Sequence, residues 1–438
     1  MPYRGGSFCD SNFLGNNHVA ALVPAAPIAY QPGMDLATLA PSRIVTVARA
    51  AFARPDTEFL CFGEGDQPAP PGAALALQAA LARGDALYPD VRGVPVLRQA
   101  LADHLTALHA RPVDEGRIQV TASGMTAVSV ALMAIVRAGD RVVLHTPAWP
   151  NPANATRLRG AAVDALPLDP RADGGFHLDL GRLAAKLPGA RALILNSPNN
   201  PTGWTATLDE LQSILALCRQ HGVWLISDEV YSRLVYDGAE VAPSLLDIAE
   251  PDDRVMVVNS FSKTWAMTGW RLGWLVLPRG ARDQVAEVVE VTQSGTAPFA
   301  QAGALAALAD TAFVDRFRAH CAEGRRLVGA GLAGLNGVRL AAPDGAFYAF
   351  IGVDGLQDSL ALALHLVHEH GVAVAPGSAF GEGGEGHLRL CFAQAPARME
   401  RAMHRLRKGL QASMPSMAGQ SAPVLPASVV SGPMLSAP

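Results

Sequence analysis

A lysine that directly follows an apolar run is the first candidate for chemistry. Lys263 lies in the stretch SFSKTWAMTGWRLG, just after the run VMVV at Val255–Val258, with Ser, Trp and Met as neighbours. In such a poorly solvated place burial lowers the pKa of a lysine, and the neutral amine can form a Schiff base with an aldehyde. The chain holds only two other lysines, Lys186 and Lys408. A solvated loop lysine is the alternative interpretation.

An acidic residue ends another apolar run. Asp228, in LISDEVY, comes directly after the run VWLI at Val223–Ile226. A carboxylate at the end of a buried strand requires a charged or hydrogen-bonding partner. A protonated pyridinium nitrogen would serve, because the ion pair keeps the nitrogen protonated and makes the ring an electron sink. A helix cap or a structural aspartate is the alternative, and we expect the adjacent Glu229 to make structural contacts.

A Ser-Gly pair in TASGMTAV precedes the apolar run SVALMAIV and so opens a predicted helix at Ser123 and Gly124. Backbone N–H groups at the start of a helix can hold a phosphate. Arg271 could add a bidentate grip on the same phosphate. An ordinary helix cap and a surface salt bridge are the respective alternatives.

Three further side chains suit a flat, anionic ligand. Asn200, in NSPNNPTG, precedes Pro201, which favours an extended or turn geometry, and its amide could donate to a phenolate oxygen. Trp149, in HTPAWP, could stack on a flat ring. Arg389, in GHLRLCF, alternates with apolar neighbours and requires a carboxylate, either an internal Asp or a substrate. Turn chemistry for the asparagine and a core position for the tryptophan are the alternatives.

The elements that must position these residues alternate between strands and helices. Near-continuous apolar runs, typical of strands covered on both faces, occur at 142–145, 192–195, 223–226, 255–258 and 272–277. The segment Thr207–His221 predicts a helix, with Glu210 completing a capping box and Gly222 as its C-cap. This alternation predicts an α/β fold with a mostly parallel sheet, and ligands of such sheets bind beyond the carboxyl ends of the strands.

The composition changes along the chain and suggests a domain organisation. Residues after about 305 show long helical patterns and then short strands near 347–351 and 387–392, which predicts a smaller α+β domain. Both ends of the chain lack periodicity and read as disordered. We therefore expect a disordered segment at 1–31, the N-terminal part of the small domain at 32–64, a large domain at 65–304, the rest of the small domain at 305–411, and a disordered tail at 412–438.

Composition excludes several classes of partner. The net charge of −4 gives no basic excess, so nucleic acid is not an expected partner. No apolar run approaches the roughly 20 residues of a membrane span, and prolines interrupt the apolar residues 19–29, so we expect neither a membrane segment nor a signal peptide. The five cysteines are scattered without a Cys-x-x-Cys pair, which excludes a disulfide framework or a zinc site and favours reduced thiols in the cytoplasm.

Taken together, these segments resemble the fold type I enzymes that depend on pyridoxal 5'-phosphate (PLP), specifically the class I/II aminotransferases of the aspartate aminotransferase superfamily. Ten stretches match in the family's order over about residues 40 to 410. They are FGEGD (62–66), LYPDVRGVPVLRQAL (87–101), TASGMTAV (121–128), TPAWPNP (146–152), NSPNNPTG (196–203), SDEVY (227–231), SFSKTWAMTGWRLG (260–273), DGAFYAF (344–350), VAVAPGSAFG (372–381) and GHLRLCFA (386–393).

The resemblance implies an enzyme that moves an amino group between an L-amino acid and a 2-oxo acid by a ping-pong Schiff-base mechanism. Lys263 then resembles the catalytic lysine, which joins PLP and shuttles a proton between Cα of the substrate and C4' of the cofactor. Asp228 resembles the pyridinium partner. Tyr231 and Asn200 resemble the donors to the phenolate oxygen, and Trp149 resembles the stacking residue.

The same resemblance assigns the phosphate and the substrate carboxylate. Arg389 resembles the clamp on the substrate α-carboxylate, with help from the Gly63 backbone, and Trp149 and Asn200 lie in the implied substrate site. Tyr88 resembles a tyrosine that reaches the phosphate of the neighbouring subunit, which implies a homodimer with shared active sites. The implied phosphate ligands within the chain are Ser123, Gly124, the backbone of Met125, Ser260, Ser262 and Arg271.

The chain departs from the family pattern at two places. Met125 stands where relatives often carry a polar or basic residue, and FGEGD replaces the more usual Gly-Glu-Pro-Asp. No residue for a distal carboxylate is identified, so an aspartate preference is not supported, and the sequence does not predict the amino donor or the acceptor.

Three other functions compete with an aminotransferase. A PLP-dependent carbon–sulfur β-lyase or a related lyase or synthase would use the same lysine and arginine. A PLP-binding regulator would carry a winged-helix DNA-binding domain, yet only about 40 residues precede the matched region. A dinucleotide-dependent oxidoreductase would need Gly-x-Gly-x-x-Gly between a strand and a helix, but the one literal match, at 381–386, leads into a predicted strand.

Overall fold

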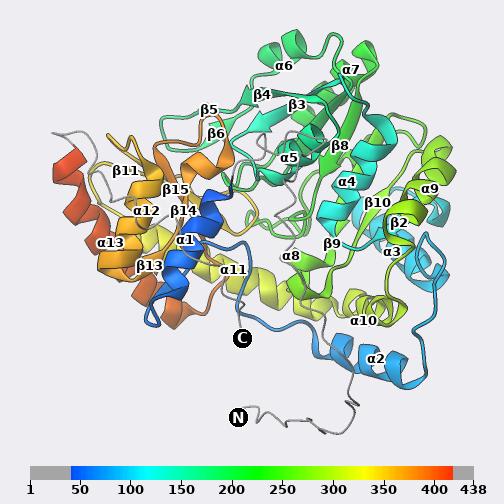
Figure 1. Ribbon diagram of the computed structural model, residues 1–438, viewed down its shortest axis with the longest axis horizontal. Coiled ribbons are helices and arrows are strands. Elements are labelled where there is room, and N and C mark those ends of the chain that lie inside the picture. The colour runs from blue at the N-terminus through cyan, green and yellow to red at the C-terminus, as the bar shows by residue number, and fades with distance from the viewer. Residues whose placement is uncertain (1–40, 418–438) are drawn as a thin grey trace, which may run out of the picture. The chain divides into compact units, whose positions relative to one another are not determined.

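A seven-stranded sheet organises much of the computed structural model, which describes residues 41–417 (Figure 1). The strands β9, β8, β7, β3 and β4 pair in parallel, whereas β10 runs antiparallel to both of its neighbours. The prediction of a mostly parallel sheet is confirmed. In spatial order the strands are β2 (Ile118–Thr121), β10 (Gly273–Val276), β9 (Val255–Ser260), β8 (Trp224–Asp228), β7 (Ala192–Asn196), β3 (Arg141–Thr146) and β4 (Ala162–Pro167).

Helices cover this sheet because its strands have two buried faces. Every residue of β7, β9 and β10 is buried, and α4 packs against β8, β9 and β10 while α3 packs against β2. The helices of this region are α2 (Pro71–Ala82), α3 (Pro95–His109), α4 (Gly124–Ile135), α5 (Asn151–Leu158), α6 (Leu180–Lys186), α7 (Leu208–His221), α8 (Phe261–Thr264), α9 (Arg282–Gln293) and α10 (Pro298–Ala309).

Helix α7 shows how local sequence sets the boundaries of an element. The Thr207 hydroxyl accepts from the Glu210 N–H at 3.2 Å, and the Glu210 carboxylate accepts from the Thr207 N–H at 2.7 Å. Gly222 ends the helix in the left-handed conformation with φ 65°. The predicted capping box and C-cap are therefore confirmed, and they satisfy groups that a helix end otherwise leaves unpaired.

A second, antiparallel sheet has the order β11 (Val338–Arg339), β12 (Tyr348–Val353), β15 (His387–Cys391) and β14 (Ala375–Pro376). Helix α11 (Thr311–Leu332) packs against α13 (Pro396–Met417), and α12 (Ser359–His370) packs against both α13 and α1 (Arg43–Phe52). Strand β1 (Glu58–Phe59) pairs in parallel with β13 (Val372–Ala373). The early segment therefore packs with the late one, and a short ribbon of β5 (Asp169–Pro170) and β6 (Phe176–His177) completes the strands.

Several predicted boundaries remain predictions. The described residues belong to one compact unit, so the divisions at 64/65 and 304/305 stay hypotheses. Residues 412–417, which we expected in the disordered tail, continue helix α13. The remaining disorder predictions, and residues 32–40 of the expected small domain, lie outside the described residues.

Neither a bilayer-crossing helix nor a metal cluster is found in the described part of the chain. Between residues 41 and 417 no helix is both long and apolar enough to cross a membrane. The same residues contain no group of three or more His, Cys, Asp or Glu side chains that could hold a metal ion.

The capping box of α7 gives a stability prediction. Replacing Thr207 by Ala removes the hydroxyl that accepts from Glu210, and we expect a loss of about 1 kcal/mol in stability. The measurement is the midpoint of urea denaturation followed by circular dichroism. Thr292→Ala is the matched control, because Thr292 is an exposed threonine inside α9 and its loss should leave the midpoint unchanged or slightly raised. Equal midpoints for both variants would contradict the assigned cap.

Candidate active site

The carboxyl ends of neighbouring strands bring the first group of predicted residues together. Asn196, Asp228 and Ser260 are the last residues of β7, β8 and β9, and Asn196 and Asp228 lie directly opposite each other in the parallel pairing. The start of α4 joins them, because a Cβ atom on Gly124 would lie 3.1 Å from the Ser260 Cβ. Convergence at this edge of the sheet is therefore confirmed.

Lys263 lies in α8, the short helix that follows β9 without a gap. The Ser260 hydroxyl caps this helix by accepting from the Ser262 N–H at 3.1 Å. The Lys263 side chain is half-buried, and its Nζ donates to the Gly63 carbonyl at 2.6 Å and lies 5.9 Å from the centre of the Tyr231 ring. Burial lowers the pKa of Lys263 to about 8. A substantial fraction of this amine is therefore neutral near physiological pH.

Asp228 is buried with few donors around it. Its side chain is 6% exposed, and among the described residues its carboxylate accepts one hydrogen bond, from the Val230 N–H at 3.4 Å. Burial raises the pKa of Asp228 to about 7. The adjacent Glu229, by contrast, accepts from Ser227, Ser244 and the Leu245 N–H, in agreement with its expected structural role. Asp228 has the capacity for a cationic partner, and Glu229 does not.

An asparagine network links Asp228 to the second sheet. The Asn196 amide donates to the Asp228 carbonyl at 3.0 Å, and its oxygen accepts from the Asn200 N–H at 2.9 Å. The Asn200 oxygen accepts from Nη1 of Arg389 at 3.2 Å. Because the Asn200 oxygen faces an arginine, its NH₂ group is left to donate elsewhere.

Arg389 is a buried cation without a carboxylate partner. It lies on β15, is 2% exposed, and forms no ion pair within residues 41–417. Its Nη2 donates to the Cys61 carbonyl, its guanidinium lies 4.6 Å from the Tyr348 ring centre and 5.1 Å from the Phe380 ring centre, and its Nε has no partner there. The internal-Asp interpretation is therefore wrong, and the arrangement fits an anionic ligand, because an unpaired buried charge is costly.

The predicted phosphate ligands already make internal hydrogen bonds. The Ser123 hydroxyl accepts from the Thr126 N–H at 2.9 Å as the cap of α4. The Ser260 hydroxyl donates to the Leu272 carbonyl at 2.8 Å. Arg271 is exposed in the left-handed conformation (φ 56°), and its Nη1 donates to the Thr268 carbonyl at 2.6 Å. No described acidic group pairs with Arg271, so the surface salt bridge is not observed.

The structure distinguishes the remaining predicted residues. Met125 and Trp149 are half-buried, and the Trp149 N–H donates to the Asn200 carbonyl at 2.9 Å. Tyr88 does not join the buried group, because its side chain is 91% exposed.

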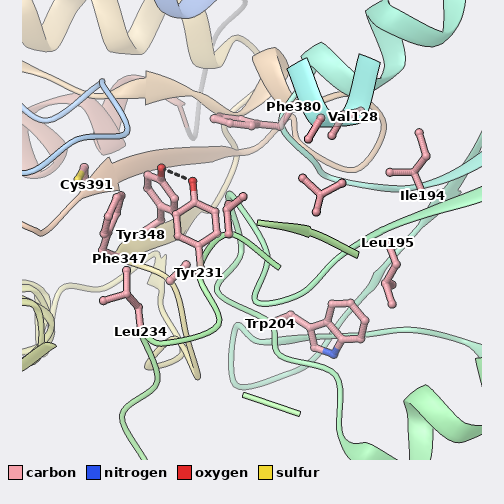
Figure 2. Close-up of a cluster of buried hydrophobic side chains, with 14 of the residues drawn as sticks. Val128, Ile194, Leu195, Trp204, Tyr231, Leu234, Phe347, Tyr348, Phe380 and Cys391 are labelled. Carbon is pink, nitrogen blue, oxygen red and sulfur yellow. Dashed lines mark hydrogen bonds between the residues drawn. The ribbon is translucent and has the colours of Figure 1, made fainter. Parts of the chain in front are cut away.

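One residue of the site was missed at the level of sequence. Figure 2 shows the Tyr348 hydroxyl facing the Tyr231 hydroxyl, and their oxygens are 2.8 Å apart. Tyr348 lies in the matched stretch DGAFYAF but carries no family role in our prediction. The signal was its place in a predicted strand of the second sheet, the sheet that also carries Arg389.

Comparisons with known proteins agree with this geometry. The family profile described as "Aminotransferase class I and II" matches residues 57–406. A probable aspartate/prephenate aminotransferase of Aquifex aeolicus is 32% identical over 80% of this chain and 90% of the relative. A valine–pyruvate aminotransferase of Mycobacterium tuberculosis is 35% identical over 79% of this chain and 89% of the relative. The crystal structure of an aminotransferase from M. tuberculosis superposes with a TM-score of 0.81 at 33% identity, over 86% of this chain and 98% of that one.

The residues present fit the cofactor of this family. Lys263 offers an amine whose pKa is lowered by burial, Asp228 offers a carboxylate with few hydrogen-bond donors, and the two lie on adjoining elements at one edge of the sheet. The relatives named above are aminotransferases, as expected, and not lyases. The chain belongs to the class I and II aminotransferases and is a PLP-dependent enzyme that transfers amino groups between amino acids and 2-oxo acids.

Proposed function

We propose that Lys263 is the catalytic residue of this aminotransferase. Asp228 binds the ring nitrogen of the cofactor, and Arg389 binds the carboxylate of the substrate. The single observation that carries the proposal is that none of these three buried or half-buried charged groups forms an ion pair with another residue between 41 and 417. When bound, PLP supplies an aldehyde that condenses with amines and a pyridinium ring that withdraws electrons. The Lys263 Nζ would take the proton from Cα of the amino acid and deliver it to C4' of the cofactor.

The remaining side chains orient the cofactor. Asp228 pairs with the ring nitrogen and keeps it protonated, because burial in a dry site strengthens an ion pair once it forms. Tyr231 and the Asn200 NH₂ group donate to the phenolate oxygen, and Trp149 stacks on the ring. The phosphate is bound by the N-terminal end of α4 and by the segment around α8. The residues are Ser123, Gly124, the backbone of Met125, Ser260, Ser262 and Arg271.

The substrate carboxylate binds at Arg389. Its guanidinium has hydrogen-bonding capacity at Nε, and a planar guanidinium binds a carboxylate in a bidentate manner. The Gly63 backbone, Trp149 and Asn200 line the same site. Because every α-amino acid and 2-oxo acid carries this carboxylate, Arg389 sets the class of substrate rather than the preferred side chain.

Exposed apolar residues support a homodimer. Helix α2 exposes Leu75 and Leu81, and the segment before α3 exposes Leu87 at 83% and Tyr88. Large exposed apolar side chains are typical of a protein interface. We infer that a second copy covers them and that Tyr88 reaches the partner's phosphate site.

The base of the Tyr88 loop is rigid, which suits this role. The buried Arg98 holds Asp90 at 3.0 Å and also donates to the Gly93 carbonyl. The Gln119 amide donates to the Val91 carbonyl at 2.8 Å. A loop fixed at its base can present an exposed tyrosine to a second subunit without a large loss of entropy.

We place the protein in the cytoplasm. The four cysteines among the described residues are free and buried. Proteins without disulfides are typical of a reducing compartment.

The lowered pKa of Lys263 predicts how attachment of PLP depends on pH. Only the neutral amine attacks an aldehyde, so the rate of covalent uptake by the apoprotein should rise with pH around a midpoint near 8. The measurement is the growth of visible absorbance after mixing with PLP between pH 6 and 10. Lys263→Ala should form no covalent adduct, and Lys186→Ala, at a lysine bound to Asp164, should behave like the unmodified protein. A rate that still rises steeply at pH 10 without reaching a midpoint, as the ordinary lysine value of 10.5 would give, would refute a desolvated amine.

The proposed role of Arg389 predicts a selective loss. Arg389→Lys removes the planar fork, so kcat/KM for an amino acid should fall about 100-fold or more, while reaction with a simple amine that lacks a carboxylate should change little. Arg326→Lys, at an exposed arginine paired with Glu323, is the control and should leave both rates unchanged. An equal fall for the amino acid and the amine would show that Arg389 has only a structural role.

A shared active site predicts complementation between two defective chains. Lys263→Ala and Tyr88→Ala subunits should each be impaired, but co-expression should form hybrid dimers in which one site has both native residues. Statistical pairing then restores about a quarter of the normal activity. The measurement is the activity of the purified mixture, with molar mass by light scattering. Activity no greater than the mean of the two separate variants would exclude a site shared through Tyr88.

A further inference from the structure

The Tyr348 side chain adjoins three residues of the proposed active site, namely Tyr231, Arg389 and Gly63. Its hydroxyl is 2.8 Å from the Tyr231 hydroxyl (Figure 2), and its ring lies 4.6 Å from the Arg389 guanidinium. A Cβ atom on Gly63 would come within 2.3 Å of the same hydroxyl. Gly63 in turn holds the Lys263 amine through its carbonyl. Tyr348 thus adjoins the groups proposed to bind the cofactor oxygen, the substrate carboxylate and the catalytic lysine.

The register of the second sheet explains the contact between Tyr348 and Arg389. Tyr348 lies opposite Cys391, and Phe350, two residues further along β12, lies opposite Arg389. Residues opposite each other in an antiparallel pair share a face, and diagonal neighbours on that face are within reach of long side chains. Arg389 is therefore a diagonal neighbour of Tyr348, and its guanidinium covers the tyrosine ring.

The two hydroxyls form an isolated pair. Tyr348 and Tyr231 are both buried, and neither hydroxyl has another hydrogen-bond partner among residues 41–417. Burial raises the pKa of both phenols, so both keep their protons over the physiological range. Of the two hydroxyl protons, one lies in the hydrogen bond between the two oxygens, and the other can be donated to an acceptor outside the pair.

The surroundings decide which hydroxyl donates outward. Tyr231 follows Asp228 by three residues and lies beside the Lys263 amine, whereas the Tyr348 hydroxyl is directed at the Gly63 backbone. We propose that Tyr348 is a positioning residue, whose hydroxyl donates to the oxygen of Tyr231 and so directs the proton of Tyr231 to the cofactor oxygen. This inference rests on the proposed role of Tyr231. A chain of two donors strengthens the outer hydrogen bond.

The consequence is measurable on the cofactor itself. A hydrogen bond donated by the Tyr231 hydroxyl stabilises the negative charge on the cofactor oxygen. It thereby lowers the affinity of that oxygen for a proton on the neighbouring nitrogen. Tyr348→Phe keeps the ring over which Arg389 lies but weakens this donation. The midpoint of the pH-dependent change in the visible spectrum of the holoenzyme should therefore rise, by about 0.2 to 0.5 pH unit.

A double-mutant cycle separates this role from a structural one. Tyr231→Phe should raise the midpoint more than Tyr348→Phe does, and adding Tyr348→Phe to Tyr231→Phe should cause no further rise. Tyr236→Phe is the matched control. Tyr236 is a half-buried tyrosine whose hydroxyl donates to the Ala346 carbonyl and is not bonded to Tyr231, so the midpoint of this variant should not move. Affinity for propionate, a monocarboxylate probe of Arg389, should stay within about twofold in Tyr348→Phe, because the ring remains.

A second variant covers the case in which Tyr348→Phe does not fold. Gly63→Ala places a Cβ atom against the Tyr348 hydroxyl and should displace it, so the midpoint should again rise. An unmoved midpoint in the folded variants, or the same rise with and without Tyr231, would overturn the positioning role. Failure of the proposed function is distinguishable, because the unmodified protein would then develop no visible band with PLP.

Discussion

The site depends on one physical constraint, which is that charged side chains are withdrawn from water without internal counter-ions. Asp228 is buried with a single long hydrogen bond to its carboxylate, and Arg389 is buried with no acidic partner among the described residues. Each arrangement is costly, because an unpaired buried charge is not compensated by solvent. The seven-stranded sheet supplies the rigidity that holds Asp228 in place, since its strand is paired on both sides. A cofactor cation and a substrate carboxylate would relieve both costs at once.

The two sheets contribute different halves of this site. Asp228 ends a strand of the seven-stranded sheet and Lys263 and Tyr231 follow its strands, whereas Arg389 and Tyr348 lie on strands of the antiparallel sheet. Polar contacts join the halves, including the 3.2 Å hydrogen bond between Arg389 and Asn200. Under the proposed function, the relative position of the two sheets therefore sets where the substrate carboxylate lies with respect to the Lys263 amine.

Sequence reasoning succeeded where local pattern determines structure. The apolar runs predicted the central strands because strands with two buried faces need apolar side chains at every position, and the caps of α7 were readable because they involve neighbours in the chain. It could not predict that β10 is antiparallel, because an apolar run reads the same for either direction of pairing. Tyr348 was missed for a related reason, since its contact with Tyr231 joins residues 117 positions apart and depends on tertiary packing that no local pattern shows.

The neighbouring carboxylates Asp228 and Glu229 show how function can be distinguished from structure at one strand end. Burial raises the pKa of both. The Glu229 carboxylate accepts hydrogen bonds from two hydroxyls and a backbone N–H, so the chain itself supplies the partners that its burial requires. Asp228, one residue away, faces the opposite side of an extended segment. Its carboxylate receives a single long hydrogen bond, from the Val230 N–H. Because both carboxylates are buried, the difference in hydrogen-bond donors is the informative quantity, and it supports the proposed role of Asp228 as the partner of a cation from outside the chain.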